Sequence, residues 1–460
     1  MRNQEPIEEP GYFWLSTQPE TKLPGTLYIS ESCEITLEIL GMFGDPIAAL
    51  KKPGTLSRIV GLIRSEYITL DLCAYKRKNV RFSGISKSII TAKFAFLGVA
   101  YDDKEVIRFS KFVFSVEGLD EWLLITGIKT ELNADDLSVS IQYDRPKDIS
   151  LQLPGDINLT FLFSYSMTGG GTELEAKINQ KAFIALHSKT EKPIEDFLSL
   201  VYKINLFLCF AIDKTVSLDF TEGFSQNLMK EGEPGKTVQQ PVRIYHKIIP
   251  HIEPTPKIYW HDMLFRYDQV AEDLEGLLAK WLANYQLSEP AFNLYFAYKS
   301  GAQRYIDGRF LSLVQGIETL HRRNSTKTLM PSDEFKRLVQ TLLGGCPSEK
   351  KQWLNARIAY GNELPLRQRL TEMIEPFQAL YGTKEERITF IEMVIDTRNY
   401  LTHYDEKLSD KAATGIPLWR LCMKIEVLFQ LHFLRLMGLS EPLIKTLAME
   451  NESIKWKLKQ

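Results

Sequence analysis

Two different periods of hydrophobic residues divide this chain of 460 residues near residue 250. Before that point, short segments alternate apolar and polar residues, a pattern typical of half-buried β-strands. Beyond it, apolar residues recur every three to four positions, a pattern typical of amphipathic helices. The pattern therefore predicts an α+β multidomain fold with a β-rich first half and an all-helical second half.

The predicted strands are short, rich in β-branched and aromatic residues, and separated by polar turns. Regular short strands favour a sandwich or two packed sheets, so we expect a sandwich-like region over residues 1–250. A division of this region into two sub-domains near residue 145 stays open. The predicted strands are 34–40, 58–63, 67–72, 91–99, 106–116, 137–143, 149–153, 158–165, 173–178, 182–187, 216–220 and 242–249, with helices at 119–126 and 193–213.

A proline-rich segment at 251–258 is the predicted hinge between the halves. Proline lacks the N–H that helix interiors and central strands need, so this segment interrupts both. The helices predicted for the second domain, 259–460, are 261–285, 289–299, 309–322, 332–343, 349–358, 366–380, 384–404 and 419–439. Pro376 falls inside one of them, so that helix should kink or split near Glu375.

Composition excludes several classes of protein. The formal net charge of −2 excludes a general polyanion binder, so any contact with nucleic acid must come from a local patch. The apolar runs are too short to cross a bilayer, and the N-terminal residues give no signal-peptide core. Five scattered cysteines favour a reducing cytoplasm over disulfides or a zinc site. We therefore expect a cytoplasmic protein with no membrane partner, metal or cofactor.

The candidate chemistry is concentrated in the hexapeptide Arg-Asn-Tyr-Leu-Thr-His at 398–403. It combines a permanent cation with the side chain that titrates near neutral pH. A capping box at Thr383–Glu386 predicts where its helix begins. At 100° per residue, Asn399 and His403 lie one turn apart, whereas Arg398 and His403 diverge by about 140°. The cation and the imidazole can therefore converge only in a groove that embraces the helix, or where two copies of the helix meet.

Two copies would place two arginines and two histidines around a two-fold axis, which suits RNA cleavage without a metal. One histidine would take the proton from the 2′-hydroxyl, and the second would protonate the leaving 5′-oxygen. Arg398 would hold the scissile phosphate, while Asn399 would orient the imidazole or donate to the phosphate. The products would be a 2′,3′-cyclic phosphate and a 5′-hydroxyl. On spacing alone, the alternative is an exposed polar helix face with His403 favoured by the helix dipole.

The hexapeptide at 398–403 resembles the R-x4-6-H motif of HEPN ribonucleases, including the polar residue favoured directly after the arginine. The region from about 285 to 450 resembles the ApeA-like HEPN branch. Within it, Phe310–His321 is similar to the early helix of those domains, with its Q-x-x-E step. In the β-rich half, Phe114–Leu123 resembles the N-terminal region of ApeA proteins.

The resemblance implies a HEPN helical bundle that forms a homodimer or higher oligomer and joins two motifs in one cleft. It implies a metal-independent endoribonuclease that acts on RNA as a toxin-like effector of bacterial anti-phage defence by abortive infection. By position, Arg398, Asn399 and His403 are the expected catalytic residues. Glu318 is a candidate supporting acid, with a solvated helix carboxylate as its alternative interpretation.

The resemblance further implies that the N-terminal half senses a phage-derived trigger or restrains the nuclease. No motif in the sequence identifies such a trigger. The alternative function is a non-catalytic dimeric binding or sensor protein that uses the helical bundle only for assembly.

Overall fold

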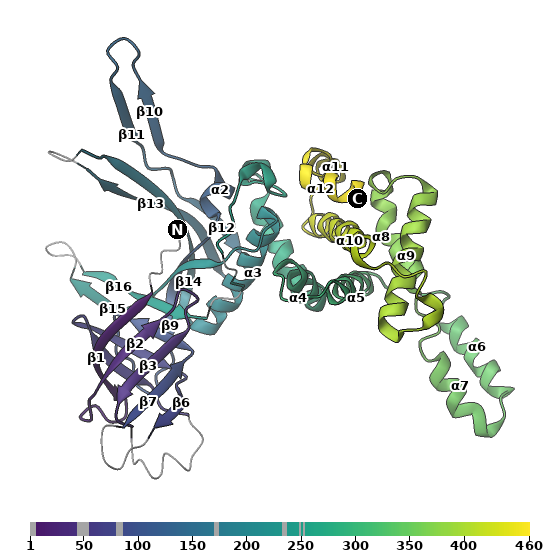
Figure 1. The fold of residues 1–460 in the computed structure, drawn as a ribbon, viewed down its shortest axis with the longest axis horizontal. Coiled ribbons are helices and arrows are strands. Elements are labelled where there is room, and N and C mark those ends of the chain that lie inside the picture. Colours follow the sequence, from purple (N-terminus) through teal and green to yellow (C-terminus); the bar gives the residue numbers. More distant parts are fainter. Residues whose placement is uncertain are drawn as a thin grey trace. The chain divides into compact units, whose positions relative to one another are not determined.

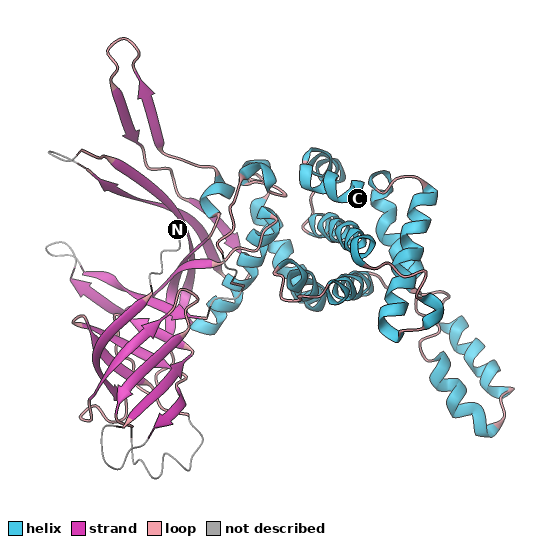
Figure 2. Cartoon of the chain, viewed as in Figure 1, coloured by secondary structure: helices cyan, strands magenta, loops and turns pink. Residues whose placement is uncertain are grey.

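The computed structural model describes residues 6–43, 55–79, 86–169, 174–231, 237–247, 250–251 and 254–460. The chain forms two compact units, Met1–Ala279 and Lys280–Gln460. The named strands all lie in the first unit, whereas the second unit is helical (Figures 1 and 2). The predicted α+β multidomain architecture is confirmed.

Among the described residues of the first unit, 14 strands form one antiparallel sheet. Its order is β12-β13-β14-β9-β15-β16-β8-β5-β4-β1-β2-β3-β7-β6. The bounds are β1 (Ile7–Leu15), β2 (Leu23–Ile29), β3 (Ile35–Leu40), β4 (Ile59–Ile63), β5 (Glu66–Asp71), β6 (Ala74–Asn79), β7 (Lys87–Ala92), β8 (Phe94–Leu97), β9 (Arg108–Val116), β12 (Ile149–Leu153), β13 (Ile157–Thr168), β14 (Lys177–Pro193), β15 (Leu218–Glu231) and β16 (Thr237–His246). A separate hairpin pairs β10 (Ile128–Leu132) with β11 (Val139–Tyr143).

The sheet is continuous across residue 145. Strand β9 precedes that residue, yet it pairs with β14 on one side and β15 on the other. Strand β8 likewise pairs with β5 and with the late strand β16. The described strands therefore give no sub-domain division near residue 145, because long-range pairing interleaves early and late strands in one sheet.

Aromatic side chains fill the core between the sheet and helix α3 (Ile194–Ile212). Phe112 of β9 stacks on Phe197 of α3, with ring centroids 5.6 Å apart. The fully buried Trp122, in the short helix α2 (Leu119–Leu123), packs edge-on against Phe207 of α3. Burying these rings explains why α3 is apolar on most of its faces.

The boundary between the two units lies later than the predicted hinge. The amides of Leu264 and Phe265 donate to the carbonyl of Ala211 at 2.8 and 3.3 Å. The carbonyl of Phe265 in turn accepts from the indole N–H of Trp122 at 3.1 Å. These bonds attach residues 259–279 to the first unit, whereas their hydrophobic period assigned them to the helical domain. Residues 252–253 of the predicted hinge lie outside the described part of the chain.

The second unit is a bundle whose centre is the packing of α5 against α10. Its helices are α4 (Leu274–Lys299, which begins in the first unit), α5 (Ile306–Asn324), α6 (Ser332–Gly344), α7 (Lys351–Ile358), α8 (Leu366–Ile374), α9 (Lys384–His403), α10 (Gly415–Leu436), α11 (Glu441–Glu450) and α12 (Glu452–Lys459). Gly316 of α5 allows close contact, because a Cβ there would lie 2.7 Å from the ring of Phe429 on α10. Helix α8 ends at Ile374, and a 3₁₀ turn containing Pro376 follows, as the sequence predicts.

A buried ion cluster connects α10 with α4 and α12. The carboxylate of Glu426 lies 2.8 Å from the Lys299 ammonium and 2.9 Å from that of Lys457, and it accepts a hydrogen bond from the Tyr298 hydroxyl. Burial alone would raise the pKa of Glu426, but the two ammonium groups prevail and lower it to about 2. Helix α12 is therefore part of the packed core.

Candidate functional site

The hexapeptide at 398–403 occupies the last turns of α9. The helix begins at the predicted capping box: the Thr383 hydroxyl accepts from the Glu386 amide, and the Glu386 carboxylate accepts from the Thr383 amide. It ends at His403, and Tyr404 takes the left-handed conformation (φ 51°) that closes many helices. Because α9 is one helix throughout this span, the motif is held on a regular scaffold.

Buried contacts fix which face of α9 points outward. Val394 and Leu401 are buried in the bundle, and the buried Thr397 hydroxyl accepts from the amide of Ala413 at 2.9 Å. This bond joins α9 to the segment that precedes α10. The rotation of α9 is therefore set by its inner face, and the remaining arc carries the polar residues of the motif.

Arg398 projects into an open groove between α9 and α5. The groove has a volume of about 400 Å³. It is lined by Leu311, Val314, Gln315, Glu318, Thr319, Arg322, Arg398 and Thr402. Nη1 of Arg398 donates to Oδ1 of Asn399 at 3.0 Å, and Nη2 lies 3.9 Å from Oε2 of Glu318. The lining thus carries two guanidinium groups and one carboxylate, and Arg322 also lies 2.9 Å from Glu363 outside the groove.

Glu318, the candidate supporting acid, contacts both guanidinium groups of the groove. It lies 3.2 Å from Nη2 of Arg322 in addition to its contact with Arg398. The sequence did not indicate that α5 and α9 form this groove together. Gln315, Glu318 and Arg322 recur at helical spacing, so a shared face of α5 was the available signal.

His403 is exposed at the end of α9 and is not among the residues that line the groove. The structure therefore brings Arg398 and Asn399 together but leaves the imidazole apart, in keeping with the angular divergence along the helix.

The other two histidines of the second unit, all of which the structure describes, are buried. Nε2 of His321 lies 3.0 Å from the Glu372 carboxylate, and its Nδ1 lies 3.3 Å from the Arg369 guanidinium. Nε2 of His432 donates to the carbonyl of Met373 at 2.8 Å, and burial lowers the pKa of His432 to about 4. Both rings make internal hydrogen bonds, whereas His403 is the exposed histidine of this unit.

Within the described ranges of the chain, no group of three or more His, Cys, Asp or Glu side chains is placed to hold a metal ion. None of the described helices combines the length and apolar character that a membrane crossing requires.

Comparison with known families covers both units. The model of ApeA N-terminal domain 1 matches residues 8–281, and the model of Apea-like HEPN matches residues 311–443. The first match ends beside the structural boundary at Ala279, and the second contains the groove and the hexapeptide. No curated protein and no solved structure matches the chain significantly. The chain belongs to the ApeA family, with an ApeA N-terminal domain 1 followed by an Apea-like HEPN domain.

Proposed function

We propose that this ApeA-family chain is a metal-independent endoribonuclease that acts as an effector of anti-phage defence. The observation that carries the proposal is that the guanidinium of Arg398, in its groove, uses few of its hydrogen-bond donors within the protein. A guanidinium has five N–H donors, and one of them is engaged, by Asn399 at 3.0 Å. The Glu318 carboxylate, at 3.9 Å, orients the group from beyond hydrogen-bond distance. Arg398 therefore keeps donors for bidentate binding of a phosphate.

The proposed reaction needs a second copy of α9. Because Arg398 and His403 diverge along one helix, we propose that two motifs meet around a two-fold axis in a homodimer or a larger assembly. One imidazole accepts the proton of the 2′-hydroxyl as the 2′-oxygen bonds to phosphorus. The other imidazole donates a proton to the departing 5′-oxygen. The products are a 2′,3′-cyclic phosphate and a 5′-hydroxyl, while arginine offsets the charge that develops on the phosphate.

The test compares the purified full-length protein with Arg398→Ala and His403→Ala. Removal of either group should slow RNA cleavage at least about 100-fold, the usual scale for loss of acid–base or charge stabilisation. Arg337→Ala on α6 and His261→Ala remove the same side-chain types at exposed positions outside the groove and should cleave at the wild-type rate. Cleavage by the wild type should persist in EDTA.

The same four variants expressed in cells give a second measurement. The wild type and both controls should be toxic and degrade RNA, whereas Arg398→Ala and His403→Ala should not. Equal RNA integrity and equal growth in all strains would contradict the nuclease and favour the alternative, a binding or sensor protein that uses the bundle for assembly.

A further inference from the structure

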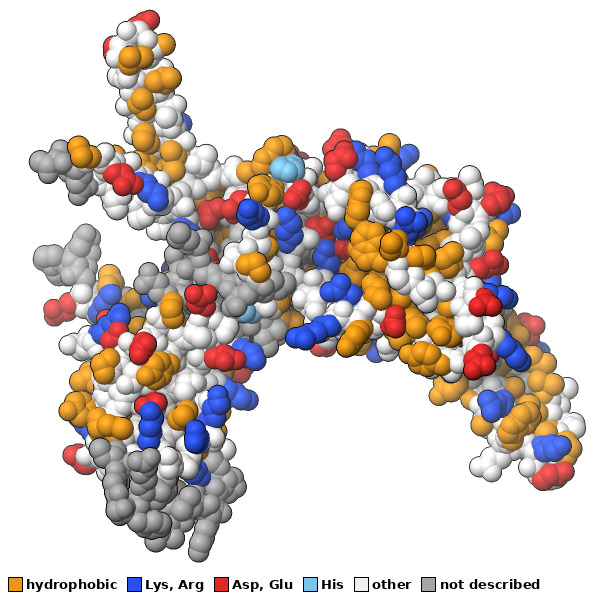
Figure 3. Space-filling view, in the orientation of Figure 1, with side chains coloured by type: hydrophobic (Ala, Val, Ile, Leu, Met, Phe, Trp, Pro, Cys, Tyr) orange, Lys and Arg blue, Asp and Glu red, His pale blue; other side chains and the backbone are white. Residues whose placement is uncertain are grey.

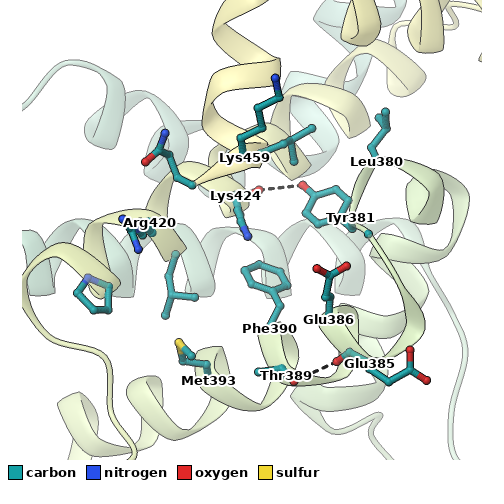
Figure 4. Close-up of a pocket in the computed structure, with 15 residues that line it drawn as sticks. Leu380, Tyr381, Glu385, Glu386, Thr389, Phe390, Met393, Arg420, Lys424 and Lys459 are labelled. Carbon is teal, nitrogen blue, oxygen red and sulfur yellow. Dashed lines mark hydrogen bonds between the residues drawn. The ribbon is translucent and has the colours of Figure 1, made fainter.

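A second cavity of the helical unit, of about 720 Å³, lies among α9, α10 and α12 (Figure 4). It shares no lining residue with the Arg398 groove. Its volume falls within the range of small-molecule sites, about 300–1,000 Å³. In the space-filling view, apolar side chains gather around α9 and α10 with Lys and Arg side chains beside them (Figure 3).

The floor of this cavity is apolar and contains a fixed aromatic surface. Phe390 and Met393 come from α9, and Leu421 comes from α10. The Tyr381 ring forms a wall, and its buried hydroxyl donates to the carbonyl of Lys424 at 2.8 Å. Because that hydroxyl already makes a hydrogen bond within the protein, a ligand would meet apolar side chains and aromatic ring faces at the floor and at this wall.

One side of the cavity carries three cations. Arg420 and Lys424 lie one turn apart on α10, and Lys459 lines the cavity from α12 with its ammonium group directed away from Phe390 (Figure 4). Among the described residues, no carboxylate lies within ion-pair distance of these three side chains. By contrast, Lys457 of α12 is buried against Glu426. The cations at the cavity are thus available to an anionic ligand.

The opposite side carries carboxylates. Glu385 and Glu386 come from the first turn of α9. The Glu386 carboxylate lies beside the Phe390 ring, whereas that of Glu385 points away from it (Figure 4). Cations on one side, a ring face in the middle and acceptors on the other side form a directional arrangement. A fatty acid has a single carboxylate, which would pair with one of the cations, and it has no donor for the carboxylates on the other side.

We propose that this cavity binds a nucleotide. The phosphates contact Arg420 and Lys424, because more than one cation suits a polyanion. The base packs on Phe390 and Met393, since every nucleobase has a π-face that stacks on aromatic side chains. An exocyclic amino group of the base donates to Glu386, which favours adenine over uracil.

Two sources share this chemistry: a free nucleotide, and a nucleotide within an RNA strand. Met393 of the cavity and Arg398 of the groove lie five residues apart on one continuous helix, so a nucleotide bound in the cavity could affect the groove. That effect on RNA cleavage rests on the proposed function. Nucleotide binding itself does not, so it can be measured without a cleavage assay.

The test is calorimetric titration of the full-length chain with ATP, UTP and a five-residue oligoadenylate. Each ligand is titrated into the His403→Ala variant, so that RNA cleavage cannot deplete the oligonucleotide. We expect binding of ATP or of the oligoadenylate, with UTP weaker than ATP. ATP alone would identify a free nucleotide as the ligand, whereas the oligoadenylate alone would identify the RNA strand.

The matched variants remove two cations each. Arg420→Ala with Lys424→Ala should weaken binding at least about tenfold, since two charge-assisted contacts to the phosphates are lost. Arg337→Ala with Lys445→Ala removes the same charge from exposed positions outside the cavity and should not weaken it. Thermal unfolding confirms that both double variants fold.

Three results would overturn the proposal. They are no binding of any of the three ligands, equal weakening by the two double variants, and UTP bound as tightly as ATP. Each leaves the nuclease proposal intact, because that proposal depends on cleavage by the wild type and its loss in Arg398→Ala. Conversely, a chain that binds ATP here yet cleaves no RNA would contradict the nuclease alone.

Discussion

Arg398 and Glu318 face each other across the groove between α9 and α5, with Nη2 and Oε2 3.9 Å apart. The same carboxylate lies 3.2 Å from Nη2 of Arg322. One acid thus orients two guanidinium groups. It is also a negative charge beside the position proposed for the RNA phosphate, so its two effects on catalysis oppose each other.

Glu318→Gln should therefore separate turnover from binding. We expect kcat to fall by up to about fivefold, which corresponds to an exposed ion pair worth 0.2–1 kcal/mol. The KM for RNA should stay the same or decrease, because one charge that repels phosphate is gone. Steady-state cleavage kinetics measure both constants. Glu392→Gln, an exposed carboxylate of α9 paired with Arg367, is the control. A raised KM in Glu318→Gln with unchanged kcat would contradict the positioning role.

If two motifs form one site, a chain without its histidine should inactivate a wild-type partner. The proposed reaction uses both imidazoles, so a mixed dimer of wild type and His403→Ala lacks either the acid or the base. Co-expressed and purified through different tags, this heterodimer should cleave RNA at least about 100-fold more slowly than the wild-type homodimer. A heterodimer of wild type with Arg337→Ala, assayed alongside at equal concentration, should cleave at the wild-type rate. About half the wild-type rate in the His403→Ala heterodimer would indicate that each chain acts by itself.

The buried cluster around Glu426 predicts a large loss of stability when its carboxylate is neutralised. Glu426→Gln removes the negative charge that lies against the ammonium groups of Lys299 and Lys457. Breaking a buried pair in this way costs about 3–5 kcal/mol. Glu452→Gln, which removes an exposed carboxylate paired with Lys455, should change stability by less than about 0.5 kcal/mol. Denaturant unfolding followed by circular dichroism compares the two.

The helical unit should become less stable as the pH decreases, because His432 is buried in its neutral form. Unfolded, this histidine takes up a proton near its ordinary pKa of 6.5, whereas burial lowers its pKa to about 4 in the fold. Its contribution is therefore complete above pH 6.5 and is lost as the pH falls toward 4. The difference amounts to about 3 kcal/mol. Unfolding measured at pH 7 and pH 4.5 tests this.

His432→Gln is the control for that pH dependence. It keeps a donor for the Met373 carbonyl but cannot titrate, so its stability should change less between the two pH values. An equally steep loss in the variant would assign the pH dependence to other groups.

Two glycines of α5 should respond oppositely to alanine. In Gly316→Ala the new Cβ would lie 2.7 Å from the Phe429 ring, so overpacking should cost about 1–3 kcal/mol. In Gly308→Ala the nearest atom is the flexible Gln303 side chain at 3.4 Å. There the better helix propensity of alanine should stabilise by up to about 1 kcal/mol. Thermal unfolding of both variants tests whether α5 and α10 are in such close contact.

Structural features that depend on residues close together in the sequence could be predicted from it. The capping box at Thr383 gave the start of α9, and Pro376 gave the break after α8, because each acts within one helical turn. Strands β1 and β2 were missed because they contain Pro10, Gly11, Pro24 and Gly25, residues typical of turns. Gly11 instead allows close strand approach, since a Cβ there would lie 2.4 Å from the Leu62 carbonyl.

The candidate site divides in the same way. Arg398, Asn399 and His403 stand together in the sequence, so their motif was visible. The partner acid Glu318 lies on another helix, and only the packing of α5 against α9 brings it to Arg398. Likewise, Leu264 and Phe265 fall within a helix predicted for the helical domain, over 261–285. Their amides instead donate to the carbonyl of Ala211, which attaches them to the β-rich unit.

The position of the unit boundary constrains how this protein can be reassembled in evolution. The boundary at Ala279 falls inside α4, not in the proline-rich segment at 251–258. A recombination event in that segment would separate the β-rich unit from Phe265, which accepts the hydrogen bond of its buried Trp122. An exchange of the helical domain that keeps both units folded must therefore join the two sequences within α4 and preserve the continuity of that helix. This ApeA N-terminal domain should therefore be exchanged together with the stretch up to residue 279.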